Sequence, residues 1–418
     1  MDPEILKSLK HNTAVNLLDG GFFGFALGFA SFITIIPLFV STLTGSAILI
    51  GLIPAIHSVG WQFPQVFTAR KVSKQSRYKP MVMTLTIQER LPFLGMAIVA
   101  WFVPTLGSQV ALVLTFLMLI WQGFGGGFTA TAWQSMIGKI IPSERLGSFF
   151  GAQSATANLL ASVSAVIAGS ILEGLTSPLD FSLCFFLAFI AMMISWLFLA
   201  QTHEPSIPPM DETPNQSDFR LKLLGILKND LSFRSFLLVR MLSQLSVMGF
   251  AFYTVYAVQY LGMSEMSIGI MTGVLLATQI IANPVMGWIG DHWSYRRIME
   301  LGLISATFSA LIAWLAPSLI SFYLVFILAG IANVAIWTIA LAMVQEYGNQ
   351  ADRPAYIGLA NTLIAPFTIL APFLGGWLAD SFSYTAAFFA SAIFGIITTT
   401  ILHWHVKDPQ RSIKCVLM

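Results

Sequence analysis

The sequence predicts an all-α membrane protein in which twelve transmembrane helices form two pseudo-symmetric six-helix bundles. Three observations support this prediction. Hydrophobic residues make up 56% of the 418 residues and charged residues only 10%, against about 25% charged residues in a soluble domain. Nearly all Lys and Arg residues fall in alternate gaps between long apolar stretches, and motifs of the first half recur in the same order in the second half.

Twelve apolar stretches are long enough to cross a bilayer, which takes about 20 residues of α-helix. They cover residues 14–41, 46–68, 80–103, 108–136, 148–174, 179–201, 235–261, 265–290, 298–317, 319–345, 355–380 and 383–406. The predicted domains are an N-terminal bundle (1–201), a linker (202–234), a C-terminal bundle (235–406) and a tail (407–418). Apolar residues that recur at helical spacing near 219–229 predict a short interfacial helix within the linker.

The basic residues indicate the topology. Nineteen of the 21 Lys and Arg residues lie before the first stretch or after an even-numbered one: Lys7, Lys10, Arg70, Lys71, Lys74, Arg77, Lys79, Lys139, Arg145, Arg220, Lys222, Lys228, Arg234, Arg296, Arg297, Arg353, Lys407, Arg411 and Lys414. Positive charge in short loops marks the cytoplasmic face, so we expect both termini to be cytoplasmic. The two exceptions, Arg90 and Arg240, lie inside apolar stretches.

The two halves of the chain repeat. The matching features are Ile50-Gly51 with Ile268-Gly269, Gly126 and Trp133 with Gly330 and Trp337, Glu144-Arg145 with Asp352-Arg353, and Gly151 with Gly358. Several matches in one order are stronger evidence than any one of them. Two parallel six-helix repeats are typical of transporters whose site lies where the halves meet, near the midplane of the membrane.

Over almost its whole length the sequence resembles the major facilitator superfamily. The most specific motif runs from Gly287 through Asp291 to Arg296 and Arg297, and it is similar to the family's loop motif between spans eight and nine. Ser294 stands where the motif has a second glycine, and the copy between spans two and three has basic residues but no Asp. The resemblance implies a gating motif of Gly287, Asp291, Arg296 and Arg297, in which Asp291 and Arg297 hold the cytoplasmic side closed.

Asp19, Glu89 and Arg90 are charged residues that lie within predicted spans of the first half. A charge there costs at least ~2.5 kcal/mol and is usually paired or functional. Asp19 is our candidate for a proton-coupling or cation-binding carboxylate, and the alternative is a helix-start acid satisfied by water or nearby amides. Glu89 and Arg90 point about 100° apart on a helix, so each should have partners on other helices. They form a structural buried pair or a substrate site, and His57 and Gln62 are possible partners.

Arg240 in the seventh span has three interpretations: contact with an anionic substrate, pairing with Asp19 at the inside-facing gate, or snorkelling to the interface. The resemblance implies that spans one, four, seven and ten line a cavity. The cavity candidates are Phe23, Gln122, Trp133, Arg240, Gln244, Tyr253, Asn333 and Trp337. Aromatic rings with scattered amides and hydroxyls suit an amphipathic or weakly polar organic molecule.

We therefore expect a secondary active transporter and not an enzyme. It would move a small organic solute by alternating access, coupled to protons through Asp19, and efflux of amphipathic compounds is favoured. Uptake of a small anionic nutrient through Arg240 is one alternative, and a non-transporting receptor or sensor on the same scaffold is another. The sequence has no Walker motif and no metal-spaced His/Cys cluster, so we expect neither cofactor nor metal. The expected partners are the substrate, membrane lipid and protons, with no nucleic acid, for a monomer in a bacterial plasma membrane.

Overall fold

The computed structural model describes residues 3–206, 216–262, 265–315, 318–349 and 351–408. Within these ranges the chain is helical with short connections, and no strand is found. Ten of the helical segments are long and apolar enough to cross a membrane, and they coincide with predicted spans three to twelve. The stretches predicted as spans one and two are helical as well, but each is interrupted. Residues Arg411 and Lys414, and part of the predicted linker and tail, lie outside the described residues.

The chain divides into two compact units. Unit 1 comprises Met1–Ile141, Thr156–Asp211 and Gln350–Thr362, and unit 2 comprises Pro142–Ala155, Glu212–Asn349 and Leu363–Met418. Two short segments differ from the domains expected from the sequence. Pro142–Ala155 belongs to unit 2 instead of the N-terminal bundle, and Gln350–Thr362 belongs to unit 1 instead of the C-terminal bundle. Both are the beginnings of long helices that packed glycines hold close to a neighbour, as described below. The domain boundaries at 201 and 235 stay predictions.

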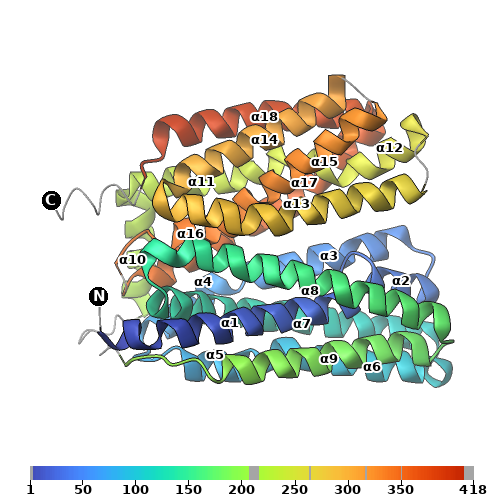
Figure 1. Cartoon of the computed structure of the whole chain (residues 1–418), viewed down its shortest axis with the longest axis horizontal. Coiled ribbons are helices and arrows are strands. Elements are labelled where there is room, and N and C mark those ends of the chain that lie inside the picture. Colours follow the sequence, from blue (N-terminus) through green and yellow to red (C-terminus); the bar gives the residue numbers. More distant parts are fainter. Residues whose placement is uncertain (1–2, 207–215, 263–264, 316–317, 350, 409–418) are drawn as a thin grey trace. The chain divides into compact units, whose positions relative to one another are not determined.

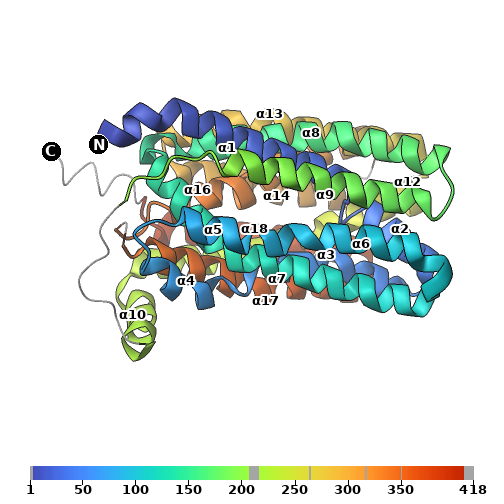
Figure 2. The same cartoon turned by 90° about the horizontal axis from the view of Figure 1, so that it is seen from below.

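Unit 1 is built on a row of long helices (Figures 1 and 2). Helix α1 packs along α9, α9 along α6, α6 along α7, and α7 along α3. The helices are α1 (Pro3–Phe29), α2 (Ile35–Leu43), α3 (Ala47–Gln62), α4 (Gln65–Ser73), α5 (Lys79–Leu85), α6 (Ile87–Leu106), α7 (Ser108–Ile140), α8 (Leu146–Gly174) and α9 (Leu179–Leu199). The first turns of α8 belong to unit 2.

Interruptions divide each of the first three predicted spans. Between α1 and α2, the Ser31 hydroxyl accepts hydrogen bonds from the amides of Ile33 and Thr34, both at 3.2 Å. Such side-chain bonds offer the backbone an alternative to the helix. Pro64, which has no amide hydrogen, separates α3 from α4. Thr86 separates α5 from α6. These spans are therefore not the continuous helices expected from hydropathy.

Unit 2 also consists of helices that pack side by side (Figure 1). Helix α14 contacts α15 and α18, α18 contacts α11, and α13 contacts α15. The helices are α10 (Gln216–Asn229), α11 (Leu231–Ser246), α12 (Tyr253–Leu261), α13 (Glu265–His292), α14 (Tyr295–Leu315), α15 (Leu319–Val334), α16 (Ala340–Val344), α17 (Arg353–Ser381) and α18 (Tyr384–His405). Helix α10 confirms the helix expected near 219–229. A π-helical turn, η3 (Ala335–Ile339), joins α15 to α16.

The exterior of both units is apolar. Large side chains such as Val166, Ile320 and Phe373 are 72%, 82% and 74% exposed. Patches of this kind would aggregate in water, but they are the normal surface of a helix in lipid. The arrangement is that of an integral, multi-pass membrane protein.

Small residues bring α1 and α8 into backbone contact within unit 1. A Cβ on Gly24 would lie 2.3 Å from the carbonyl oxygen of Ala157, and a Cβ on Gly28 would lie 1.9 Å from the Ser164 hydroxyl. Glycines four residues apart let two membrane helices approach closely. The close packing of α1 on α8 therefore requires glycine, which has no Cβ, at positions 24 and 28.

We predict that Gly24→Leu destabilises the protein and that Gly169→Leu does not. A side chain at position 24 must separate α1 from α8, which costs about 1–3 kcal/mol or more, whereas a Cβ on Gly169 would have nothing within 4 Å. Thermal unfolding in detergent, followed by tryptophan fluorescence, measures both. Equal melting temperatures for the two variants would contradict the close contact.

Candidate functional site

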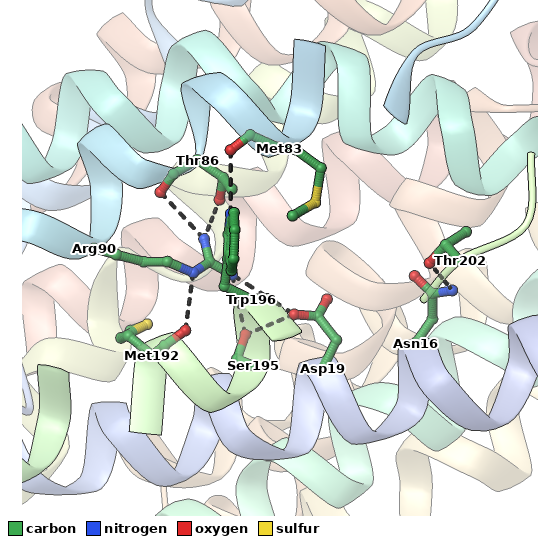
Figure 3. Close-up of polar contacts among 9 residues, drawn as sticks. All are labelled: Asn16, Asp19, Met83, Thr86, Arg90, Met192, Ser195, Trp196 and Thr202. Atoms are coloured by element: carbon green, nitrogen blue, oxygen red, sulfur yellow. Dashed lines mark hydrogen bonds and ion pairs between the residues drawn. The ribbon is translucent and has the colours of Figure 1, made fainter. Parts of the chain in front are cut away.

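A cluster of ionisable side chains is buried inside unit 1 (Figure 3). It joins Asp19 of α1, Arg90 of α6 and Ser195 of α9. Arg90 Nη2 lies 3.6 Å from Asp19 Oδ1, and the two side chains are 2% and 8% exposed. The Ser195 hydroxyl donates a 2.6 Å hydrogen bond to the same carboxylate oxygen. The carboxylate of α1 is therefore held by groups from two other helices.

The remaining donors of Arg90 bind the backbone and side chains around it. Its Nε donates to the Met192 carbonyl at 3.0 Å, and its Nη2 donates to the Ser195 hydroxyl at 3.0 Å. Its Nη1 donates to the carbonyl of Thr86 at 3.2 Å and to the Thr86 hydroxyl. Thr86 stands at the junction of α5 and α6. The guanidinium thus ties this junction to α9 as well as to Asp19.

Glu89 supplies a second carboxylate to the cluster. It interacts electrostatically with both Arg90 and Asp19. A Cβ on Gly126 of α7 would lie 2.7 Å from Glu89 Oε1, so the glycine makes room for this carboxylate. No hydrogen bond to the Glu89 side chain is found among the described residues. The Phe23 ring lies 5.9 Å from Arg90 Cζ, where an aromatic face stabilises a cation. The cluster therefore contains two acids and one base.

The sequence suggested other partners for Glu89 and Arg90. The ion pair of Arg90 is with Asp19. The ring of His57 stacks on Phe32 at 3.8 Å, and its Nδ1 lies 2.9 Å from Gln122 Oε1. His57 is therefore a packed histidine, and Gln122 of α7 is its hydrogen-bond partner.

The other cavity candidates lie in different surroundings. Gln122, Gln244 and Tyr253 are 0%, 4% and 2% exposed. Tyr253 belongs to the aromatic core of unit 2, where its hydroxyl accepts a 3.1 Å hydrogen bond from Ser309. The half-buried candidates are Phe23, Trp133, Asn333 and Trp337.

Arg240 is buried inside unit 2, with 3% of the residue exposed. Its guanidinium does not reach water, so the snorkelling interpretation does not hold. Its Nη1 donates to the carbonyl oxygen of Ile336 in the π-helical turn, a type of turn that is frequent at functional sites. Its Nε is buried without a hydrogen-bond partner. Within the described ranges no carboxylate pairs with it, and it has donors to spare.

The gating motif binds backbone amides. Asp291, in the last turn of α13, accepts hydrogen bonds from the amides of Gly147 and Ser148, both at 2.7 Å. These amides lie in the first turn of α8, where a carboxylate satisfies free N–H groups and the helix dipole. Tyr295 donates its hydroxyl hydrogen to Asp291. A Cβ on Gly287 would lie 2.1 Å from the Gly147 carbonyl, so the motif glycine permits this approach.

The two arginines of the motif have separate partners. Arg296 Nη1 donates to the Val406 carbonyl at 3.0 Å. The Arg297 guanidinium lies 4.8 Å from the centre of the Trp293 ring. In this structure Asp291 is thus held by Gly147, Ser148 and Tyr295, which the sequence had not singled out for that role.

The repeated glycines have matching structural roles. A Cβ on Gly151 of α8 would lie 2.2 Å from the Asn283 carbonyl, and a Cβ on Gly358 of α17 would lie 3.0 Å from Val66 Cα. Each glycine allows the beginning of a long helix to pack on a neighbour in its unit. Near Gly358, Asn361 donates a 2.8 Å hydrogen bond to Gln65. Arg353 donates to the Gly138 carbonyl near the end of α7.

Comparisons with known proteins give consistent results. Residues 236–415 match the sequence profile of the Major Facilitator Superfamily. Multidrug resistance protein 1 of Bacillus subtilis is 24% identical over 152 residues, which are 36% of this chain and 39% of the relative. The class B tetracycline resistance protein of Escherichia coli is 26% identical over 144 residues, 34% of this chain and 35% of the relative. The matched region therefore spans less than half the length of these curated relatives.

Solved structures match over nearly the whole chain. The transporter FucP in its outward conformation has a TM-score of 0.73 at 13% identity, covering 94% of this chain and 99% of that one. A bacterial homologue of the iron transporter ferroportin has a TM-score of 0.76 at 13% identity, covering 94% and 98%. At these identities the similarity concerns the fold.

The helical units and the apolar exterior define a polytopic membrane protein, with an ionisable cluster buried inside unit 1. Residues 236–415 resemble the Major Facilitator Superfamily in sequence, and the fold is similar to that of solved transporters of this superfamily over 94% of the chain.

We predict that Arg90→Gln destabilises the protein strongly, by about 3–5 kcal/mol, because it leaves Asp19 and Glu89 as buried carboxylates without a cation. Adding Asp19→Asn to Arg90→Gln should recover part of this loss, since one of the two charges is then gone. Denaturant unfolding of both variants measures the coupling. Arg234→Gln, at an exposed position of α11, is the matched control. A double variant no more stable than Arg90→Gln would contradict the ion pair.

Proposed function

We propose that this protein is a proton-coupled secondary active transporter that expels small amphipathic organic compounds by alternating access. Named relatives include multidrug and tetracycline resistance proteins. Two proteins with the same fold are described as a fucose:proton symporter and a proton:xylose symporter. These names support the proposal for substrate class and for coupling.

The charge balance of the cluster in unit 1 carries the proposal of proton coupling. Asp19, Glu89 and Arg90 together bear one net negative charge when all three are ionised. An uncompensated charge buried at membrane depth is costly, and one bound proton removes it. The cluster can therefore alternate between a state with the proton and a state without it.

The geometry suggests a division of roles between the two carboxylates. Asp19 accepts a hydrogen bond from Ser195 and faces Arg90, and both contacts favour its ionised form. Glu89 has no such bond within the described part of the chain, so it is the better carrier of the proton in this conformation. When Glu89 loses its proton, both carboxylates attract Arg90. A shift of Arg90 would act on the α5–α6 junction and on α1 together.

Other parts of the proposal rest on the fold and on the sequence pattern. The candidates for substrate contact stay those expected from the sequence, namely Phe23, Trp133, Asn333, Trp337, Gln122, Gln244 and Tyr253. We propose that the contact of Asp291 with the first turn of α8 is part of the gate, together with Gly287, Arg296 and Arg297. The protein would act as a monomer in a bacterial plasma membrane, with both termini in the cytoplasm and no cofactor.

We predict that Glu89→Gln and Asp19→Asn each reduce substrate-driven proton movement at least about tenfold, because each removes one titratable carboxylate from the cluster. The measurement uses proteoliposomes with an internal pH dye and tetracycline as the probe. Glu173→Gln, which alters an exposed acid of α8, should behave like the wild type. Proton movement that equals the wild type in both variants would refute coupling at this cluster. Tetracycline binding without any flux in the wild type would favour the receptor interpretation.

Arg240 supports a second candidate function, the uptake of a small anionic nutrient. Its buried guanidinium has an unused Nε and no carboxylate partner in the described part of the chain. A guanidinium with free donors is well suited to a carboxylate or phosphate. The π-helical turn, whose Ile336 carbonyl accepts a hydrogen bond from Arg240 Nη1, would then position the guanidinium and form part of the anion site.

We predict that Arg240→Gln separates the two candidates. A carrier of small anions should lose charge-assisted hydrogen bonds worth about 1.5–3 kcal/mol, which raises the Kd about tenfold or more. An exporter of neutral or cationic compounds should keep its affinity. Binding of tetracycline and of a panel of small carboxylates, measured by thermal shift, gives the comparison. Arg240→Lys keeps the charge and controls for it. Unchanged affinity for every carboxylate would exclude the anion carrier.

A further inference from the structure

A basic cavity of about 770 Å³ opens in unit 1, away from the buried cluster. It lies between the beginning of α1, the beginning of α5 and the segment that follows α9. Figure 2 shows these three parts of the chain at one end of unit 1. Its ionisable lining is formed by Lys7, His11, Arg77, Lys79, His203 and Glu204. These elements meet at the end of the unit where the sequence concentrates its Lys and Arg residues.

One wall of the cavity is formed by residues 202–203, which are held in place by hydrogen bonds although the sequence predicted them to be part of the linker. The amide of Asn12 donates a 2.8 Å hydrogen bond to the His203 carbonyl, and the His203 N–H donates a 2.8 Å bond back to Asn12. Asn16 donates to the Thr202 hydroxyl at 3.0 Å. These bonds fix residues 202–203 along α1, so the wall has a defined position.

The acid of the lining is already neutralised. Glu204 accepts hydrogen bonds from the backbone amides of Tyr78 and Lys79 at 2.8 and 2.7 Å. Lys139, whose side chain is 1% exposed, forms a 2.8 Å ion pair with the same carboxylate. The Glu204 carboxylate is therefore occupied by these partners and does not compensate the positive charges that face the cavity.

The side chains of Lys7, Arg77 and Lys79 have no ion pair or hydrogen bond within the described part of the chain. Three unpaired cations around one cavity repel one another unless an anion lies between them. Arg and Lys together suit a phosphate, which accepts several charge-assisted hydrogen bonds. Pro80 and Met83 add an apolar surface beside these cations.

We propose that this cavity binds a phosphate group, carried by an anionic phospholipid. Basic pockets at the cytoplasmic ends of membrane helices bind such headgroups, and each Lys or Arg near an anionic membrane surface strengthens the binding. The bound headgroup joins α1 to α5 and to the segment after α9, and it stabilises unit 1. Free phosphate offers the same chemistry without the acyl chains.

The test compares two triple variants with the same loss of charge. One is Lys7→Gln, Arg77→Gln and Lys79→Gln, and the other is Lys10→Gln, Lys71→Gln and Lys74→Gln, which lies outside the cavity. Thermal unfolding of the full chain in a neutral detergent is measured with added phosphatidylglycerol, phosphatidylcholine or sodium phosphate. Native mass spectrometry counts the lipids that each protein retains.

Phosphatidylglycerol should raise the melting temperature of the wild type and of the control variant, since a ligand stabilises the state that binds it. The cavity variant should lose most of this shift and should retain at least one lipid fewer. A shift produced by sodium phosphate alone, absent in the cavity variant, would identify free phosphate as the source. Equal shifts with the two lipids, or equal shifts for the two triple variants, would overturn the proposal.

Discussion

The compensation of one buried arginine governs the arrangement of unit 1. Arg90 lies at membrane depth, where no water is available to solvate its guanidinium, so other helices must provide its partners. Asp19 comes from α1, the Met192 carbonyl and the Ser195 hydroxyl from α9, and Thr86 from the junction of α5 and α6. Each of these elements therefore supplies at least one partner of the guanidinium. The same requirement brings two carboxylates close to one cation, and that imbalance is what we propose as the basis of coupling.

Much of the fold could be predicted from the sequence because lipid imposes simple constraints. Apolar stretches of bilayer length predicted where the spans lie, and ten of those spans are present as continuous or nearly continuous helical segments. The helix breaks at 30–34 and at Thr86 could not be read from hydropathy, because both segments are apolar. At 30–34 the Ser31 hydroxyl binds backbone amides without making the segment polar. The resemblance to a family gave the overall fold, and the comparisons confirm it.

The sites were less predictable because their partners are distant in sequence or belong to the backbone. Two opposite charges in apolar spans signalled that Asp19 and Arg90 needed partners, but nothing in the sequence paired them across the 70 positions that separate them. Asp291 was recognised through its motif. Its partners are the amides of Gly147 and Ser148, and amides carry no signature in a sequence. Residues 202–204 were predicted as linker from their polarity, yet Asn12, Asn16 and Lys139 fix them to unit 1.

The π-helical turn at Ala335–Ile339 has a consequence for how the chain length can vary. A turn of this kind contains one residue more than the α-helical turn that it replaces, so losing one residue here would give a regular helix without shifting the segments on either side. Elsewhere in a packed helix, the same loss would rotate every following side chain by about 100°. Differences of one residue between homologous chains should therefore concentrate in this turn. In this chain the carbonyl oxygen of Ile336, within the π-helical turn, accepts a hydrogen bond from Arg240. A homologue with the shorter, regular helix would not present this acceptor in the same way, so we expect it to have lost the arginine at the position of Arg240 as well.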